Sequence, residues 1–97
     1  MRETRIIEFK ETITNTFLKT VSAFSNYNGG EIYFGIDDNG NVKGIADVKQ
    51  SCLDIENKIN DSISPQPYYT LEIQKDSTIK LTVKSGIHKP YLYKSKA

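Results

Sequence analysis

The chain has 97 residues, of which 37% are hydrophobic and 26% are charged. This length allows one domain with a two-layer core, and this composition excludes both a disordered tail and a membrane-spanning segment. The formal net charge of +1 provides no overall basic field, so a polyanionic partner would have to be held by a local patch.

The first half of the chain predicts a strand, a helix and a hairpin. Residues 5–10 alternate as a short strand. Apolar residues at helical spacing predict a helix over 12–26, which begins at the N-cap residue Thr12 and ends at the glycine pair 29–30. Residues 31–37 predict a second strand, and a turn at Asp38–Asn41 leads into a short return strand at 42–45.

The second half predicts another helix and another hairpin. Apolar residues spaced by three and four predict a helix over 47–63, which ends before Pro65 because the residue before a proline disfavours the helical conformation. Two alternating runs at 69–75 and 78–84 predict an antiparallel hairpin, and residues 91–93 predict a last edge strand. The order is β-α-β(β)-α-β-β. It predicts a single α+β domain over residues 1–97, with two layers and two helices packed on a mixed sheet.

The sequence also predicts a compartment. Cys52 is alone, which excludes an internal disulfide and fits a reducing cytosol. The N-terminus carries charges where a signal peptide needs an apolar core, and no run is long enough to span a membrane. We therefore expect a cytoplasmic protein with no membrane partner.

Carboxylates gather on the first two predicted strands. Glu3 and Glu8 lie on or before the first, and Asp37 and Asp38 end the second. If these strands pair, Glu8 and Asp37 could approach each other. Converging carboxylates repel unless a hard cation neutralises them, so Glu3, Glu8 and Asp37 are candidate ligands for Mg²⁺ or Mn²⁺. Such an ion could activate water against a phosphodiester.

Lys10 would lie on the same strand face as Glu8, where it could hold the scissile phosphate. The alternative is that Glu3, Glu8 and Lys10 form a solvated strand edge, and that Asp37 and Asp38 only start a turn.

Other residues give weaker signals. The glycine pair at 29–30 follows a helix, whereas a phosphate loop precedes one, and no nucleotide-binding motif is present. His88 is the single histidine and has no nucleophile placed near it by a motif. The six tyrosines could stack on bases or could pack on a sheet face. The lysines are scattered along the sequence, at Lys10, Lys19, Lys43, Lys84, Lys89 and Lys94.

Several ordered motifs resemble one known family. They are Glu3 with Glu8-Phe9-Lys10, Ala23-Phe24-Ser25-Asn26 with the glycine pair, the segment from Gly35 to Ile45, Ile63 with Pro65, and Lys89-Pro90-Tyr91. Together they resemble the Schlafen-type Alba-like domain, once called a divergent AAA domain and often labelled a DNA-binding domain. The resemblance covers nearly the whole chain and implies an α+β fold.

The resemblance also implies functions. In bacteria and archaea such domains usually begin longer proteins described as transcriptional regulators or helicase-related proteins. In animal Schlafen proteins the related domain is a nuclease that cuts tRNA and other RNA with two glutamates and an aspartate. By position these resemble Glu3, Glu8 and either Asp37 or Asp38.

The chain departs from that family in two ways. Animal Schlafens carry two copies of the domain, so this single copy would need to form a homodimer to imitate them. Relatives also continue past the Lys89-Pro90-Tyr91 motif, so we expect a C-terminal effector domain that this chain lacks.

Three functions compete at this point. The first is a nucleic-acid-binding module of a regulator, which contacts DNA or RNA through Lys10, Lys19, Lys43 and Lys89. The second is a metal-dependent endoribonuclease with Glu3, Glu8, Asp37 and Asp38 as catalytic residues. The third is a protein-interaction or dimerisation domain in which the carboxylates play no part.

Overall fold

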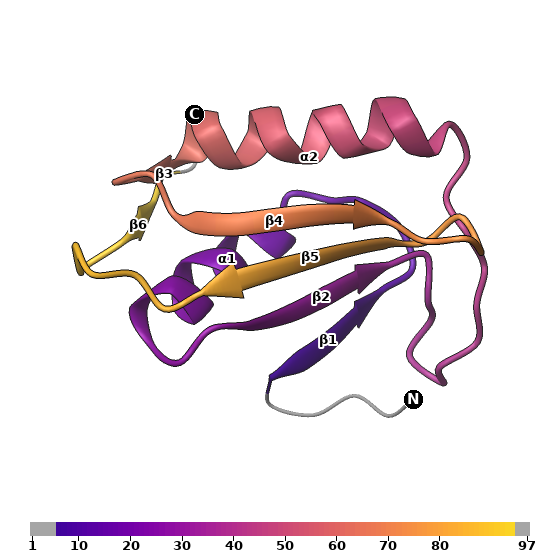
Figure 1. The fold of residues 1–97 in the computed structure, drawn as a ribbon, viewed down its shortest axis with the longest axis horizontal. Coiled ribbons are helices and arrows are strands. Elements are labelled where there is room, and N and C mark those ends of the chain that lie inside the picture. Colours follow the sequence, from indigo (N-terminus) through magenta and orange to yellow (C-terminus); the bar gives the residue numbers. More distant parts are fainter. Residues whose placement is uncertain (1–5, 95–97) are drawn as a thin grey trace.

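The computed structural model describes residues 6–94. Its elements follow one another as β1 (Ile7–Lys10), α1 (Phe17–Asn26), β2 (Gly30–Phe34), α2 (Val48–Ser62), β3 (Ile63–Ser64), β4 (Tyr68–Ile73), β5 (Ile79–Lys84) and β6 (Leu92–Tyr93). The α+β class is confirmed, and so is the packing of two helices on a mixed sheet (Figure 1). In residues 6–94, neither α1 nor α2 has the length and apolar composition that a membrane-spanning helix requires.

Four strands form the main sheet in the order β1-β2-β5-β4. β1 and β2 are parallel, with Glu8 opposite Ile32, because α1 returns the chain to the starting end of β1. β5 is antiparallel to both β2 and β4. A separate ribbon pairs β3 with β6 beside the end of α2.

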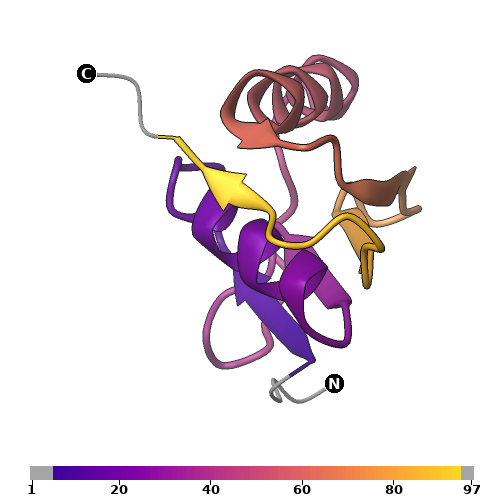
Figure 2. The same ribbon diagram turned by 90° about the vertical axis from the view of Figure 1, so that its left-hand side faces the viewer.

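Both helices lie on one face of the sheet (Figure 2). Phe17 and Val21 of α1 and Ile55 and Ile59 of α2 are fully buried against the apolar residues of β2 and β5. Burial of one such side chain contributes about 1.5–3 kcal/mol, so this shared layer is the main stabilising feature. The spacing that predicted the two helices therefore also identified their buried faces.

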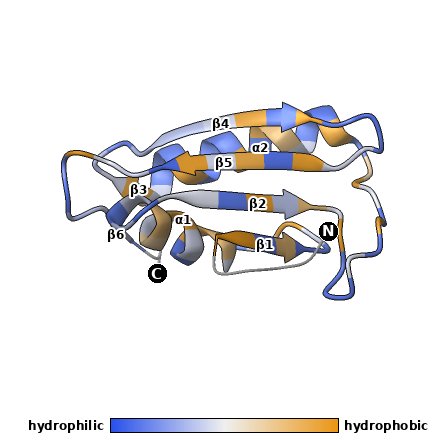
Figure 3. Cartoon of the chain, turned by 60° about the horizontal axis from the view of Figure 1, so that its bottom comes forward, coloured by the Kyte–Doolittle hydropathy of each residue, from blue (hydrophilic) through white to orange (hydrophobic). Residues whose placement is uncertain are grey.

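The other face of the sheet has no helix over it in the part that the structure describes (Figure 3). Its residues alternate with the core residues along each strand, as in other sheets that bury one face. Lys80 of β5 forms an ion pair with Glu31 of β2 at 3.3 Å and lies 6.0 Å from the centre of the Tyr33 ring. This face is mixed in charge.

The first helix begins later than predicted. It starts at Phe17, and Thr12 is not its N-cap. The preceding Thr-Asn-Thr run instead forms a turn, in which the Phe17 N–H donates to the Thr14 carbonyl at 3.3 Å. Threonine and asparagine favour such local bonds over a helix, which explains the shorter element.

Gly29 ends α1 as predicted. It adopts φ +80°, and its N–H donates to the Phe24 carbonyl at 2.9 Å. A Cβ atom at this position would lie 2.6 Å from the Val83 carbonyl oxygen. The glycine is therefore required both for the turn and for the close approach of β5.

The predicted return strand at 42–45 is reduced to a single bridge between Ile36 and Val42. The chain reverses at Asp37, whose main-chain N–H donates to the Asn41 carbonyl at 3.0 Å. The sequence predicts only half of the short ribbon of β3 and β6, because residues 91–93 read as a strand whereas Ile63–Ser64 lies at the predicted helix end and proline turn.

Candidate nucleic-acid interface

Glu8 lies on β1, on the sheet face that the helices cover. Its Oε2 accepts a hydrogen bond from the Thr20 hydroxyl of α1 at 2.9 Å and lies 3.6 Å from the Lys10 ammonium. The Glu8 side chain is therefore half-buried between strand and helix, and Lys10 partly neutralises it. The two residues share a face as the strand alternation predicted.

Asp37 begins the turn after β2. Its Oδ1 accepts the main-chain N–H groups of Asn39 and Asn41, each at 2.9 Å, and its Oδ2 lies 3.9 Å from the Lys43 ammonium. These hydrogen bonds, led by the one from the Asn41 main chain, hold the pKa of Asp37 below its ordinary value. Asp37 thus stabilises the turn, as in the alternative in which Asp37 and Asp38 only start a turn. Asp38 is exposed beside it.

Glu8 lies on β1, but Asp37 lies beyond β2, because the strand predicted over 31–37 ends at Phe34. The register places Glu8 opposite Ile32, five residues before Asp37. An extended chain covers on the order of 15 Å in that interval. Among residues 6–94, no three His, Cys, Asp or Glu side chains are grouped so that they could hold a metal ion. Glu3 lies outside the described residues, so the three-carboxylate site stays a prediction.

Charge is divided between the two ends of the sheet. Where β1, β2 and β4 finish, five carboxylates form what we call the acidic end: Glu11, Asp37, Asp38, Asp47 and Asp76. Lys10, Lys43, Lys49 and Lys75 lie at the same end, and two of them are paired with carboxylates. Two of the four lysines predicted to bind nucleic acid, Lys10 and Lys43, therefore lie in an acidic environment.

The opposite end carries positive charge. We call it the basic end, and it consists of Lys84, Lys89 and Lys94, all of them exposed. From residue 77 onward the sequence has no Asp or Glu, a signal that was visible before the structure. The nearest carboxylate on α2 is Asp61, in its last turn. Lys89 is thus the one predicted lysine that belongs to this cluster, and Lys19 is exposed on α1.

The loop that carries Lys89 is fixed to the C-terminal end of α1. The Asn26 side chain donates to the Tyr91 carbonyl at 2.8 Å and accepts the Tyr91 N–H at 2.6 Å. Ser22 donates to the same carbonyl at 2.7 Å, and the Gly86 N–H donates to the Ser25 carbonyl at 2.9 Å. Tyr91 is fully buried, so this tyrosine packs in the core and cannot stack on a base.

Exposed aromatic and apolar side chains accompany the basic end. Tyr27 follows α1, and Tyr68 begins β4 opposite Lys84. Ile87 lies in the loop between β5 and β6, and all three side chains are exposed. Lysines interleaved with aromatic side chains can contact phosphates and bases together. The end of the sheet where β5 finishes therefore combines exposed lysines with exposed aromatic side chains.

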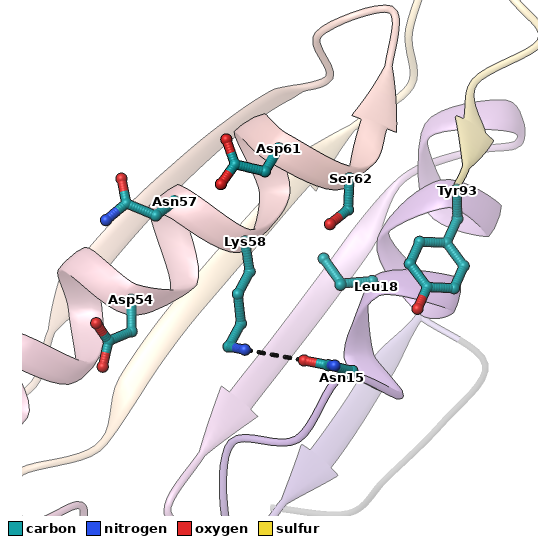
Figure 4. A pocket seen from close by; sticks show the side chains of 8 residues that line it. All are labelled: Asn15, Leu18, Asp54, Asn57, Lys58, Asp61, Ser62 and Tyr93. Carbon is teal, nitrogen blue, oxygen red and sulfur yellow. Dashed lines mark hydrogen bonds between the residues drawn. The ribbon is translucent and has the colours of Figure 1, made fainter. Parts of the chain in front are cut away.

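A polar cleft of about 420 Å³ separates α1 from α2 (Figure 4). The Lys58 ammonium crosses it and donates to the Asn15 side-chain carbonyl at 2.9 Å. Asp54 and Asp61 line the same cleft. With two carboxylates and one engaged lysine, this cleft does not suit a polyanion.

Comparison with known proteins agrees with this architecture. None of the curated proteins is significantly similar to the chain. A solution structure of the N-terminal domain of a RecG-related protein from Nitrosomonas europaea is similar in fold, with a TM-score of 0.68 and 21% identity over 100% of this chain and 75% of that one. The crystal structure of the DIP2311 protein from Corynebacterium diphtheriae gives a TM-score of 0.59 and 17% identity, over 94% of this chain but 20% of that one.

The decisive comparison is with a protein family. The sequence pattern of the family described as Schlafen, AlbA_2 matches residues 3–97, which is nearly the whole chain. The matched range includes the Asn26 and Tyr91 segments that the structure joins. The chain therefore belongs to the Schlafen, AlbA_2 family.

Proposed function

We propose that this domain is a non-catalytic nucleic-acid-binding module that contacts phosphates through the basic end. The observation that carries the proposal is the separation of charge along the sheet, which puts Lys84, Lys89 and Lys94 at the same end as the exposed Tyr27 and Tyr68 although the chain as a whole is nearly neutral. The fold it shares with the N-terminal domain of a protein related to the DNA helicase RecG supports the same class of partner.

Affinity should be modest and strongly dependent on salt. Each phosphate neutralised on a single strand changes the slope of log K against log salt by about 0.7. Three lysines therefore predict a slope near −2, which corresponds to weak binding at physiological salt. Binding should not require a divalent cation, because the lysine ammonium groups contact the phosphates directly.

The test is a fluorescence anisotropy titration of short labelled single-stranded DNA, single-stranded RNA and duplex DNA over a range of salt concentrations. The variant Lys84→Gln/Lys89→Gln removes two charges from the basic end. It should weaken binding severalfold at low salt and make the salt slope shallower by about 1.4 on a single strand.

The matched control is Lys43→Gln/Lys75→Gln, which removes the same charge from exposed positions at the acidic end. It should change affinity much less. Equal losses in the two variants would mean that net charge, not a located surface, governs binding. A chain that binds none of the three probes at low salt would exclude the proposal outright.

A metal-dependent endoribonuclease is the second candidate. The observation that favours it is the parallel pairing of β1 and β2, because Glu8 lies on β1 beside Lys10 and Asp37 follows shortly after the end of β2. We expect a nuclease of this kind to cut tRNA only with added Mn²⁺ or Mg²⁺, and Glu8→Gln to abolish cutting while the fold survives. The control is Glu11→Gln, an exposed carboxylate three residues away. Cleavage that survives Glu8→Gln would remove Glu8 from the reaction.

A further inference from the structure

Among residues 6–94, no strand pairs with the outer edge of β4. β4 is the last strand of the sheet, and α2 lies behind it on the helix face (Figure 3). The Gln74 N–H donates to the Thr78 carbonyl, which fixes the alternation of the β4–β5 ladder. Tyr69, Leu71 and Ile73 therefore direct their main-chain N–H and C=O groups outward, away from β5.

This edge has few of the features that usually block pairing. Residues 68–73 contain no proline, lysine or glycine, the strand is six residues long, and its one charged residue, Glu72, lies opposite Lys80 of β5. Natural sheets normally protect such an edge with a charge, a proline or a bulge, because an open row of main-chain groups pairs readily with another strand. An occupant for the edge is therefore expected.

An apolar groove runs along the same edge. A space of about 620 Å³ lies between α2 and β4, and its apolar walls include Cys52, Leu53, Leu71 and Ile73. Leu53 is 54% exposed and Ile73 is 42% exposed, which is high for residues beside a core. The groove and the strand edge form one continuous surface.

The groove carries one positive and one negative residue, Lys49 and Glu56, and a two-fold rotation would bring each beside the opposite charge of a second copy. Lys49 and Glu56 lie on the groove side of α2, seven residues apart, with Leu53 between them. α2 runs opposite to β4 (Figure 1), and Glu56 and Tyr69 line the same groove, so Glu56 lies near the beginning of β4 and Lys49 near its end. Burial, followed by the Glu56 charge, raises the pKa of Tyr69. Four helix residues span about 6 Å and two strand residues about 6.8 Å, so Leu53 lies near Leu71.

We propose that the β4 edge and its groove bind a second copy of this chain, forming a two-fold dimer with one continuous eight-stranded sheet. The axis passes beside Leu71, so that β4 pairs antiparallel with β4 of the second copy. Tyr69 then pairs with Ile73 of the second copy, and Lys49 lies beside Glu56 of the second copy. The two apolar grooves close against each other.

The register follows from the residues. With the axis at Leu71, Leu71 pairs with Leu71 of the second copy, and Tyr69 pairs with Ile73. The main-chain N–H and C=O groups of these residues point away from β5, so each pair can be hydrogen-bonded. Moving the axis to Glu72 would place two Glu72 carboxylates directly opposite, which is unfavourable. Moving it to Thr70 would place Ile73 opposite Pro67, which has no N–H to donate. The Leu71 register avoids both penalties.

The test is sedimentation equilibrium of the chain over a concentration series, with charge-swap variants. Lys49→Glu alone and Glu56→Lys alone each place like charges across the interface twice, so each should weaken dimerisation about tenfold. The double variant Lys49→Glu/Glu56→Lys restores both pairs and should recover the affinity of the unmodified chain. Within one copy these residues are two helical turns apart, so the swap leaves the monomer fold intact.

A second measurement follows the main chain. Amide exchange at Tyr69, Leu71 and Ile73 should be fast at low protein concentration and slow where the dimer forms. Ile73→Lys should abolish dimerisation, and Val42→Lys, at a loop position that is 53% exposed, should not. A chain that stays monomeric at millimolar concentration overturns the proposal. A dimer unaffected by both the charge swap and Ile73→Lys also overturns it, because that dimer uses another surface.

Discussion

Asn26 offers the sharpest test of how the chain holds its C-terminal segment. In the variant Asn26→Ala the Tyr91 N–H loses its acceptor at 2.6 Å, and the Tyr91 carbonyl loses one of its two donors. A buried N–H left without a partner costs about 1–3 kcal/mol, and the lost second donor about 1 kcal/mol or less because Ser22 still donates. We expect a total destabilisation of about 2–3 kcal/mol.

That loss is large for a domain of this size, whose total stability is about 5–15 kcal/mol. It should lower Tm by roughly 10–20 °C. Ser22→Ala removes only the redundant bond and should cost about 1 kcal/mol. The assay is urea unfolding followed by circular dichroism, with the m-value held constant between variants.

The control for Asn26→Ala is Asn57→Ala, which makes the same change at an exposed position of α2. It isolates the small gain in helix propensity that alanine brings, and it should leave stability unchanged or slightly raised. The reasoning is refuted if Asn26→Ala costs less than about 0.5 kcal/mol, or if the control costs as much.

Three further outcomes are expected. Gly86→Ala should destabilise the fold by about 1–3 kcal/mol in the same urea assay, because the added methyl group would overlap the buried Tyr91 ring. Asp37 and Asp76 both have pKa values lowered by hydrogen bonds, so they stabilise the folded state above about pH 4, and that contribution is lost as pH falls through their folded pKa. Asp37→Asn or Asp76→Asn should therefore flatten the fall in urea midpoint below about pH 4, and an unchanged fall would contradict the assignment. Burial, followed by the Glu56 charge, raises the pKa of the Cys52 thiol, so alkylation at pH 8 should be slower than for a free cysteine and should reach its half-maximal rate at a higher pH.

The layer architecture could be predicted from the sequence because the apolar residues repeat at helical spacing in the helices and at every second position in the strands. Ile55 and Ile59 repeat at helical spacing, and residues 79, 81 and 83 alternate with polar neighbours, so the buried faces of α2 and β5 were predicted correctly. The start of α1 was not, because Thr12–Thr16 satisfies a helical pattern through Ile13 while its threonine and asparagine side chains favour a turn. Local competition of that kind has no periodic signature.

The candidate site, like the fold, could be predicted from the sequence only in part. Pairing of β1 with β2 was anticipated, but the register was not, and the register decides how far Glu8 lies from Asp37. The grouping of Lys84 with Lys89 depends on how the loop after β5 folds back onto α1, which the Asn26–Tyr91 hydrogen bonds determine. Such long-range polar contacts cannot be read from spacing, although Asn26 and Tyr91 both stood in the motifs that identified the family.

The separation of the two charged ends has a consequence for motion in solution. A formal charge of +1 suggests that the chain barely responds to a distant polyanion. Opposite charges at the two ends of the sheet nevertheless give the molecule a dipole moment along its strands, and a dipole experiences a torque in the field of a phosphate backbone. The domain should therefore rotate its basic end forward before contact is made. Its association rate should then fall with ionic strength more steeply than its net charge implies.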